Sequence, residues 1–178
     1  MIKNIFILVP SLSPTGPVKG AIALANSLAC KRKVYLAILK QGNNAHVRID
    51  PKVEIIYLYE FGTWFHRLKS YKTFLEDIGS KANVVSISSC FSADLLNLFC
   101  RNKAMICSSI RGNLPLNYSL DYGWKGNVLA AAHLSLVRGF HHVVVMSHAM
   151  SAQVSRYLGR TPEIIGNFVD EEALEKYR

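Results

Sequence analysis

The chain has 178 residues, of which 50% are hydrophobic, and it carries 21 Lys and Arg residues against 12 Asp and Glu residues. No stretch approaches the roughly 20 apolar residues that a membrane-spanning helix needs, and the first residues lack the pattern of a signal peptide. The net charge of +9 favours anionic partners, such as phosphate-bearing ligands or an anionic membrane surface. No helix-turn-helix, RNP-type or zinc-finger pattern supports binding to nucleic acid.

The cysteines show no C-x-x-C spacing, which argues against a metal site and predicts reduced, buried thiols at Cys30, Cys90, Cys100 and Cys107.

Residues 5–28 predict a strand, a loop and a helix. Residues 5–9 form an uninterrupted apolar run that is typical of a strand buried on both faces. Pro10 ends this run, a loop of small residues follows, and apolar residues then recur at helical spacing up to Leu28. In doubly wound domains ligands bind where strands end and helices begin, and Gly16 would let a phosphate approach such a helix start. The loop contains neither G-x-G-x-x-G nor a P-loop motif, so a tight connection without a ligand stays open as an alternative.

Strands alternate with helices along the rest of the chain. Helical patterns separate most of the apolar runs, and residues 113–126 are expected to form an aromatic loop. The pattern predicts an α/β fold, a Rossmann-like three-layer sandwich with a mostly parallel sheet of six to seven strands. The further expected strands are residues 34–39, 53–59, 83–88, 104–107, 143–146 and 164–165.

Two polar residues follow predicted strands on the rim where Gly16 is expected. Ser89 follows the fourth strand and Arg111 follows the fifth. An arginine at such a place suits a phosphate or a carboxylate, because its guanidinium can bind two oxygens at once. A salt bridge within the loop is the alternative interpretation of Arg111.

Residues 62–77 predict a basic amphipathic helix with aromatic residues. Such a helix could lie in a membrane interface, where each Lys or Arg near anionic lipid adds about 1 kcal/mol. The alternative is an ordinary surface helix whose apolar stripe packs on the sheet. The candidate membrane-docking residues are Trp64, Arg67, Lys69 and Lys72.

Four passages, in order along the chain, resemble GT-B glycosyltransferases of family 4. T-G-P-V-K at 15–19 with L-A-N-S-L at 24–28 resembles the G-G-x-x-R loop and the LAN-x-L helix of that family. F-S-A-D-L-L at 91–96 resembles the H-G-F-x-A-D-L-L segment, and S-S-I-R-G at 108–112, with Y-G at 122–123, falls where members often read T-I-H-N before Y-G. S-H-A-M at 147–150 with I-I-G-N-F-V-D at 164–170 resembles the passage into the interdomain linker.

The resemblance implies one half of an enzyme built from two Rossmann-like domains that face each other across a cleft. Residues 1–165 would form the acceptor-side domain and residues 166–178 the start of the linker, with the donor-binding C-terminal domain absent. Family members transfer sugar from a nucleotide-sugar, generally with retention, without a metal or other cofactor and without an assigned covalent nucleophile, so catalytic residues stay unassigned. Carried over by position, Thr15, Gly16 and Lys19 would contact the donor diphosphate. Ser89 and Arg111, which stand where members often have histidine, would contact the acceptor.

The expected function is therefore a hexosyltransferase-type activity on a glycan or lipid-linked acceptor, in bacterial surface-polysaccharide or lipopolysaccharide synthesis. The isolated domain is expected to be inactive, cytoplasmic and peripheral on the inner membrane face. One alternative is a non-catalytic remnant or split-enzyme subunit that binds a membrane or a separate donor-domain partner. Another is a different Rossmann-type enzyme, although Gln41 and Gly42 stand where a ribose-binding acidic residue would be expected.

Overall fold

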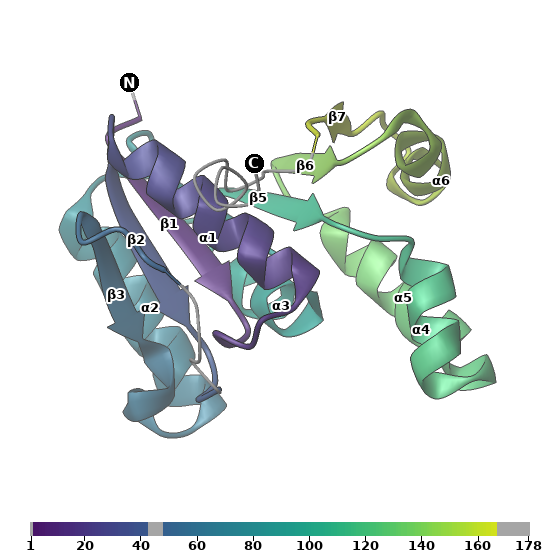
Figure 1. Cartoon of the computed structure of the whole chain (residues 1–178), viewed down its shortest axis with the longest axis horizontal. Helices are drawn as coiled ribbons and strands as arrows, with labels where there is room; N and C mark the ends of the chain where they lie inside the picture. Colours follow the sequence, from purple (N-terminus) through teal and green to yellow (C-terminus); the bar gives the residue numbers. More distant parts are fainter. Residues whose placement is uncertain (1, 43–47, 167–178) are drawn as a thin grey trace, which may run out of the picture.

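The computed structural model describes residues 2–42 and 48–166, which form a parallel seven-stranded sheet with helices on both faces (Figure 1). The strand order is β3-β2-β1-β4-β5-β6-β7, and every neighbouring pair is parallel. This confirms the predicted Rossmann-like α/β class. The strands are β1 (Asn4–Val9), β2 (Lys33–Ile38), β3 (Val53–Tyr57), β4 (Val84–Ser88), β5 (Met105–Ile110), β6 (His142–Val145) and β7 (Glu163–Ile164).

The helices form the two outer layers. In Figure 1, α1 lies in front of the sheet, α2 and α3 lie behind it, and α4 and α5 extend away from the end of β5. The helices are α1 (Gly16–Ala29), α2 (Trp64–Ile78), α3 (Phe91–Leu98), α4 (Leu114–Tyr122), α5 (Trp124–Val137) and α6 (His148–Leu158), and a short 3-10 turn, η1 (Leu58–Phe61), precedes α2.

Strand β1 shows how the alternation of side chains builds the three layers. Ile5, Ile7 and Val9 pack with α1 in one buried cluster, whereas Phe6 and Leu8 pack with α2 and α3 in another. Because successive residues of a strand point to opposite faces, a fully apolar strand is buried on both sides. The continuous apolar run at the start of the chain therefore forms the centre of the sheet.

The expected aromatic loop at residues 113–126 is wrong: the structure has helix α4 and the start of α5 there. Asn113 caps α4 by accepting a hydrogen bond from the Leu116 N–H at 3.1 Å, and Pro115 lies in the first turn. Gly123 then breaks the helix at a φ of +60°, a conformation that suits glycine. Asn, Pro and Gly, which indicate a loop when read alone, here mark the two ends of a helix. The linker prediction for 166–178 falls, apart from residue 166, outside the described residues.

Helices α4 and α5 form a tightly packed hairpin because Gly126 has no side chain. A Cβ atom at Gly126 would lie 1.9 Å from the Tyr118 carbonyl oxygen, which is closer than two non-bonded heavy atoms can approach. The two backbones therefore meet directly at this point. This contact holds the hairpin in one shape and positions Tyr118.

Replacing Gly126 by Ala should destabilise the protein, since the new methyl group forces the two helices of the hairpin apart. We expect the free energy of unfolding, measured by urea denaturation, to fall by about 1–3 kcal/mol, as for overpacked interiors. Gly16→Ala is the matched control, because a Cβ there meets nothing within 4 Å. A Gly126→Ala protein as stable as Gly16→Ala would contradict the packing described.

Candidate functional site

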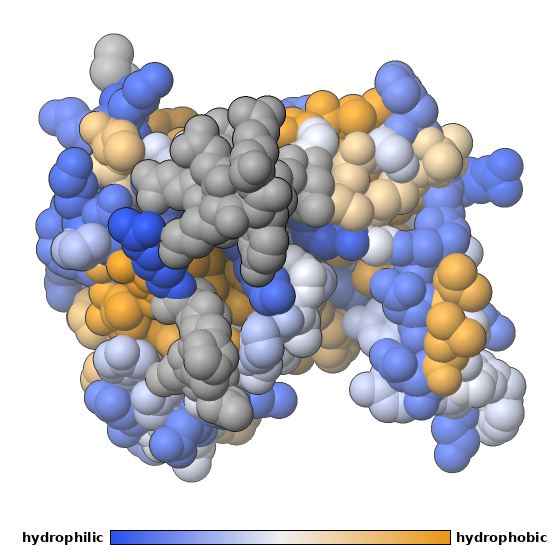
Figure 2. Space-filling view, in the orientation of Figure 1, coloured by the Kyte–Doolittle hydropathy of each residue, from blue (hydrophilic) through white to orange (hydrophobic). Residues whose placement is uncertain are grey.

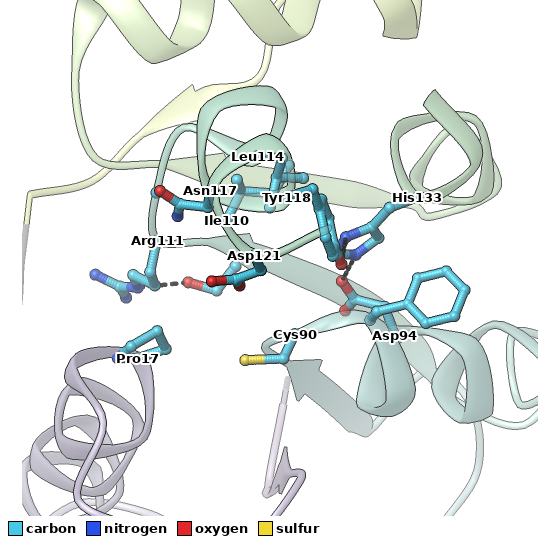
Figure 3. Close-up of a pocket in the computed structure, with 13 residues that line it drawn as sticks. Pro17, Cys90, Asp94, Ile110, Arg111, Leu114, Asn117, Tyr118, Asp121 and His133 are labelled. Atoms are coloured by element: carbon cyan, nitrogen blue, oxygen red, sulfur yellow. Dashed lines mark hydrogen bonds and ion pairs between the residues drawn. The ribbon is translucent and has the colours of Figure 1, made fainter. Parts of the chain in front are cut away.

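A pocket of about 170 Å³ opens at the carboxyl edge of the sheet, where α1 and α3 begin and β5 ends (Figure 3). Its wall combines the start of α1, the residues after β4, the end of β5 and one face of the α4–α5 hairpin. The pocket is smaller than the roughly 300 Å³ at which ligand sites usually start, so it would cover only part of a ligand of ordinary size. The lining residues are Pro17, Cys90, Phe91, Asp94, Ser109, Ile110, Arg111, Gly112, Leu114, Asn117, Tyr118, Asp121 and His133.

Arg111 stands on one side of the pocket, directly after β5. Its Nε donates to the Ser109 Oγ at 2.8 Å, and its Nη1 donates to the Gly166 carbonyl at 3.4 Å. Burial lowers the pKa of this guanidinium, although arginine stays charged at neutral pH. The rim position predicted for Arg111 is therefore occupied by a half-buried cation held in place by its neighbours.

The three predicted diphosphate contacts lie at the first turn of α1, beside the pocket. Thr15 is the N-cap residue with extended backbone, and its carbonyl accepts the Lys19 N–H at 2.9 Å. Thr15, Gly16 and Lys19 are all exposed, and the space around Gly16 is open. None of the three lines the pocket itself, but the next residue, Pro17, does. Their role in diphosphate binding stays a prediction.

Ser89 is placed differently, because it is buried with 5% of its surface exposed and does not line the pocket. Its neighbour Cys90 takes the rim position and has a φ of +77°. Glycine occupies this position in the H-G-F segment that the sequence resembles, and a non-glycine residue with such a φ is strained. Burial raises the pKa of the Cys90 thiol to about 11. The expectation of buried cysteines is confirmed at Cys100, holds in part at the half-buried Cys90 and Cys107, and fails at Cys30, which is exposed at the end of α1.

A buried carboxylate, Asp94 of α3, forms the back of the pocket. Its Oδ1 accepts the Ser88 hydroxyl at 2.6 Å, and its Oδ2 accepts the Ser108 hydroxyl at 3.0 Å and the His133 Nε2–H at 2.8 Å. Asp94 and His133 are each 1% exposed. Three donors from β4, β5 and α5 thus compensate for burying this carboxylate.

The Tyr118 hydroxyl lies 3.0 Å from Nδ1 of His133, on the side of the imidazole away from Asp94. A neutral imidazole that donates through Nε2 accepts a hydrogen bond from the Tyr118 hydroxyl at Nδ1, whereas a charged imidazole donates from Nδ1 to the Tyr118 oxygen. Burial raises the pKa of Tyr118 to about 12, which keeps its hydroxyl neutral at neutral pH. Figure 3 shows Tyr118 beside His133, on the opposite side of the pocket from Arg111. The Tyr118 oxygen therefore retains lone pairs with which it can accept a ligand hydroxyl.

The same network continues into the core behind the pocket. The Asn97 side chain donates to the Ser88 hydroxyl at 2.9 Å and accepts the Ser86 hydroxyl at 2.7 Å, and Ser86 lies 2.6 Å from the Tyr71 hydroxyl. In the described part of the chain, no buried side-chain nitrogen or oxygen lacks a hydrogen-bond partner. The pocket is thereby joined to the centre of α2 through a satisfied polar chain.

Sequence analysis missed Asp94, His133 and Tyr118 as site residues. Asp94 lies within the F-S-A-D-L-L passage at 91–96, and His133 lies buried on α5. The sequence signal that could have indicated these two residues is an ionisable side chain on the buried face of a helix, which occurs once in α3 and once in α5. Nothing in the spacing says that residues 94 and 133 meet, since the contact spans 39 positions.

The four candidate membrane-docking residues lie on α2 in different environments. The Arg67 guanidinium donates to the Gly62 and Leu39 carbonyls at 2.7 and 2.8 Å, which fastens the start of α2 to the end of β2. Trp64 is half-buried with edge-on contacts to Phe65 and Phe99. Lys69 is exposed and Lys72 is half-buried. Membrane docking by these residues stays a prediction.

The described residues contain neither a membrane-spanning helix nor a cluster of metal-binding side chains. No helix among residues 2–42 and 48–166 is long and apolar enough to cross a bilayer. Over the same residues, no three His, Cys, Asp or Glu side chains gather where they could hold a metal ion. The expectation of a metal-independent site stays a prediction.

Removing the Asp94 carboxylate should destabilise the fold, because Ser88, Ser108 and His133 would lose their buried acceptor. We expect Asp94→Ala to lower the free energy of unfolding by at least about 3 kcal/mol, measured by urea denaturation. Asp121→Ala removes an exposed carboxylate from the rim of the same pocket and should change stability by less than about 0.5 kcal/mol. Equal stabilities of the two variants would rule out Asp94 as the anchor of the site.

Comparison with known proteins supplies a structural likeness. No protein-family model and no curated protein matches the sequence. The solved structure of Phytolacca americana UGT2, complexed with UDP-2-fluoro-glucose and pterostilbene, superposes with a TM-score of 0.63 at 13% identity. The match covers 99% of this chain and 57% of the UGT2 chain, so the present chain spans little more than half of that protein. The chain has the Rossmann-like fold of one half of a GT-B glycosyltransferase.

Proposed function

We propose that the chain is the acceptor-side half of a glycosyltransferase that moves a sugar from a nucleotide-sugar to a glycan or a lipid-linked acceptor. One observation carries the proposal: the carboxyl-edge pocket brings Pro17 at the start of α1, Arg111 and the Tyr118–His133–Asp94 chain to one place. In open parallel sheets this edge is where ligands bind. UGT2, whose fold this chain shares in part, was solved with UDP-2-fluoro-glucose and pterostilbene.

The start of α1 is the proposed contact for the donor diphosphate. Backbone N–H groups at a helix start and the helix dipole favour an anion, and the open space at Gly16 leaves room for one. Thr15 and the Lys19 ammonium would add side-chain contacts. Stabilising the departing diphosphate by such fixed donors is electrostatic catalysis.

Tyr118 is the proposed contact for the accepting hydroxyl. Its hydroxyl lies 3.0 Å from His133 Nδ1, and its oxygen would accept the O–H of the acceptor and orient the hydroxyl oxygen toward the donor sugar. A neutral phenol at neutral pH orients rather than deprotonates, which agrees with a retaining reaction in which the donor phosphate takes the proton. Arg111, opposite Tyr118, suits an anionic group on the acceptor. Ser89 is a weaker candidate because it is buried.

The finer assignment extends the resemblance to family 4 and is part of the proposal. It places the enzyme in surface-polysaccharide or lipopolysaccharide synthesis, as a hexosyltransferase without a metal or other cofactor, cytoplasmic and peripheral on the inner membrane. A donor-binding half would complete the cleft, and the isolated chain would have little activity.

Gly16→Val in the native enzyme, with its donor-binding half, should lower sugar transfer by at least about 100-fold, since the side chain stands where the diphosphate approaches. Its melting temperature should stay unchanged, because that side chain projects into open space. Transfer is measured from a panel of radiolabelled nucleotide-sugars to a membrane lipid extract and to glycan primers. Lys31→Ala, just beyond the other end of α1, is the control and should keep full activity. Full activity of Gly16→Val would remove the loop from the mechanism, and no transfer by the wild-type enzyme would contradict the function.

A second candidate is a non-catalytic subunit that binds a membrane through α2. The observation in its favour is the exposed Phe65, 75% accessible, beside Trp64 and the exposed Lys69. Trp64 fluorescence in the presence of anionic vesicles tests this candidate. An unchanged Trp64 emission would contradict it.

A further inference from the structure

Large apolar side chains that face water are concentrated on the α4–α5 hairpin. Leu120 and Trp124 are each 76% exposed and Val128 is 63% exposed, and Leu116 and Tyr122 are exposed beside them. Figure 2 shows hydrophobic residues gathered over this hairpin at the lower right of the molecule. Contiguous exposed apolar surface of this kind usually marks an interaction site.

The hairpin holds these side chains outward in a fixed arrangement. The backbone contact between Gly126 and Tyr118 joins the two helices close to their turn, and the Tyr118 hydroxyl is within hydrogen-bond distance of the buried His133. Gly123 makes the sharp turn between the helices at a φ of +60°. The hairpin also projects from the end of β5, away from the sheet (Figure 1). A rigid hairpin with exposed apolar side chains on its projecting end is suited to inserting those side chains into an apolar environment.

The chemistry of the hairpin favours a lipid surface. Trp124 and Tyr122 belong to the residue types that collect at membrane interfaces, and the Lys125 ammonium lies 5.8 Å from the Trp124 ring centre, where it can reach a lipid phosphate. The single acidic residue of the hairpin, Asp121, turns into the pocket wall. The chain as a whole carries a net charge of +9, which attracts it to anionic lipid.

We propose that the α4–α5 hairpin docks the protein on an anionic bilayer, with Leu120, Trp124 and Val128 entering the interface. This surface is distinct from α2, where Trp64 is half-covered by aromatic neighbours and Arg67 is engaged by backbone carbonyls. The docking is independent of the proposed sugar transfer.

The hairpin also leads from the proposed bilayer contact to the pocket. A second hollow of about 390 Å³ is lined by Phe91, Tyr118, Tyr122 and Leu129, and it shares Cys90, Phe91 and Tyr118 with the first pocket. An apolar chain that leaves the bilayer along the hairpin would pass through this hollow to Tyr118 and Arg111. This step rests on the proposed function and selects a lipid-linked acceptor over a free glycan.

The chain has two tryptophans, one on each candidate membrane surface, so tryptophan fluorescence can report on lipid binding by each surface separately. In Trp64→Phe protein, Trp124 is the reporter for the hairpin, and in Trp124→Phe protein, Trp64 is the reporter for α2. Each is mixed with vesicles of phosphatidylglycerol or of phosphatidylcholine, with and without brominated acyl chains. We expect Trp124 emission to shift to shorter wavelength and to be quenched by brominated phosphatidylglycerol, with a weaker response to phosphatidylcholine. Unchanged Trp124 emission with both lipids would overturn the proposal.

A matched pair of variants tests the same surface by vesicle sedimentation. Leu120→Ser combined with Val128→Ser should weaken binding to phosphatidylglycerol vesicles by at least about ten-fold, because two side chains lose their apolar transfer. Phe65→Ser, on α2 and similarly exposed, should leave binding within about two-fold. All three positions are exposed, so circular dichroism should show an unchanged fold. The opposite order of the two effects would assign docking to α2 and overturn the proposal. No sugar donor is present, so failure here is separate from failure of the proposed transferase activity.

Discussion

The buried carboxylate of Asp94 is the interaction on which the carboxyl edge of this domain depends. A charge with 1% exposure is tolerable only with full compensation, and its donors come from β4, β5 and α5. The imidazole of His133 is also hydrogen-bonded to the Tyr118 hydroxyl, which connects α4 to the same buried group. One buried group thus links three helices, α3, α4 and α5, with two strands, β4 and β5, in the wall of the pocket.

This arrangement places a polar network between apolar clusters of the core. Around β1 the sheet is held by aliphatic and aromatic packing on both faces. On β4 and β5, buried serines take the place of aliphatic residues on the face of the sheet that contacts α3, and their small size leaves room for the polar network. Hydrogen bonds impose direction as well as proximity, which packing alone does not. The polar network therefore holds Tyr118 on one side of the pocket, and the Ser109 hydroxyl contacts Arg111 on the other side.

Local patterns predicted the strands, the class of fold and the rim on which Arg111 lies, because buried parallel strands leave continuous apolar runs. They did not predict α4, since Asn113, Pro115 and Gly123 resemble loop residues until their places in the helix are known. They also did not predict the pairing of Asp94 with His133, which depends on tertiary packing between α3 and α5. Burial of Ser89 was likewise invisible, because only the packed sheet distinguishes it from Cys90 at the rim.

We propose that an acceptor and a donor diphosphate bind at one edge of the sheet, and hydrogen–deuterium exchange of the native protein tests this most directly. Exchange is compared with and without a panel of nucleotide-sugars and the membrane lipid extract. The account predicts added protection in peptides that cover residues 13–19 and 109–122, and none in peptides at the opposite edge, such as residues 31–34. Binding that protects other segments and leaves both of these unchanged would contradict it.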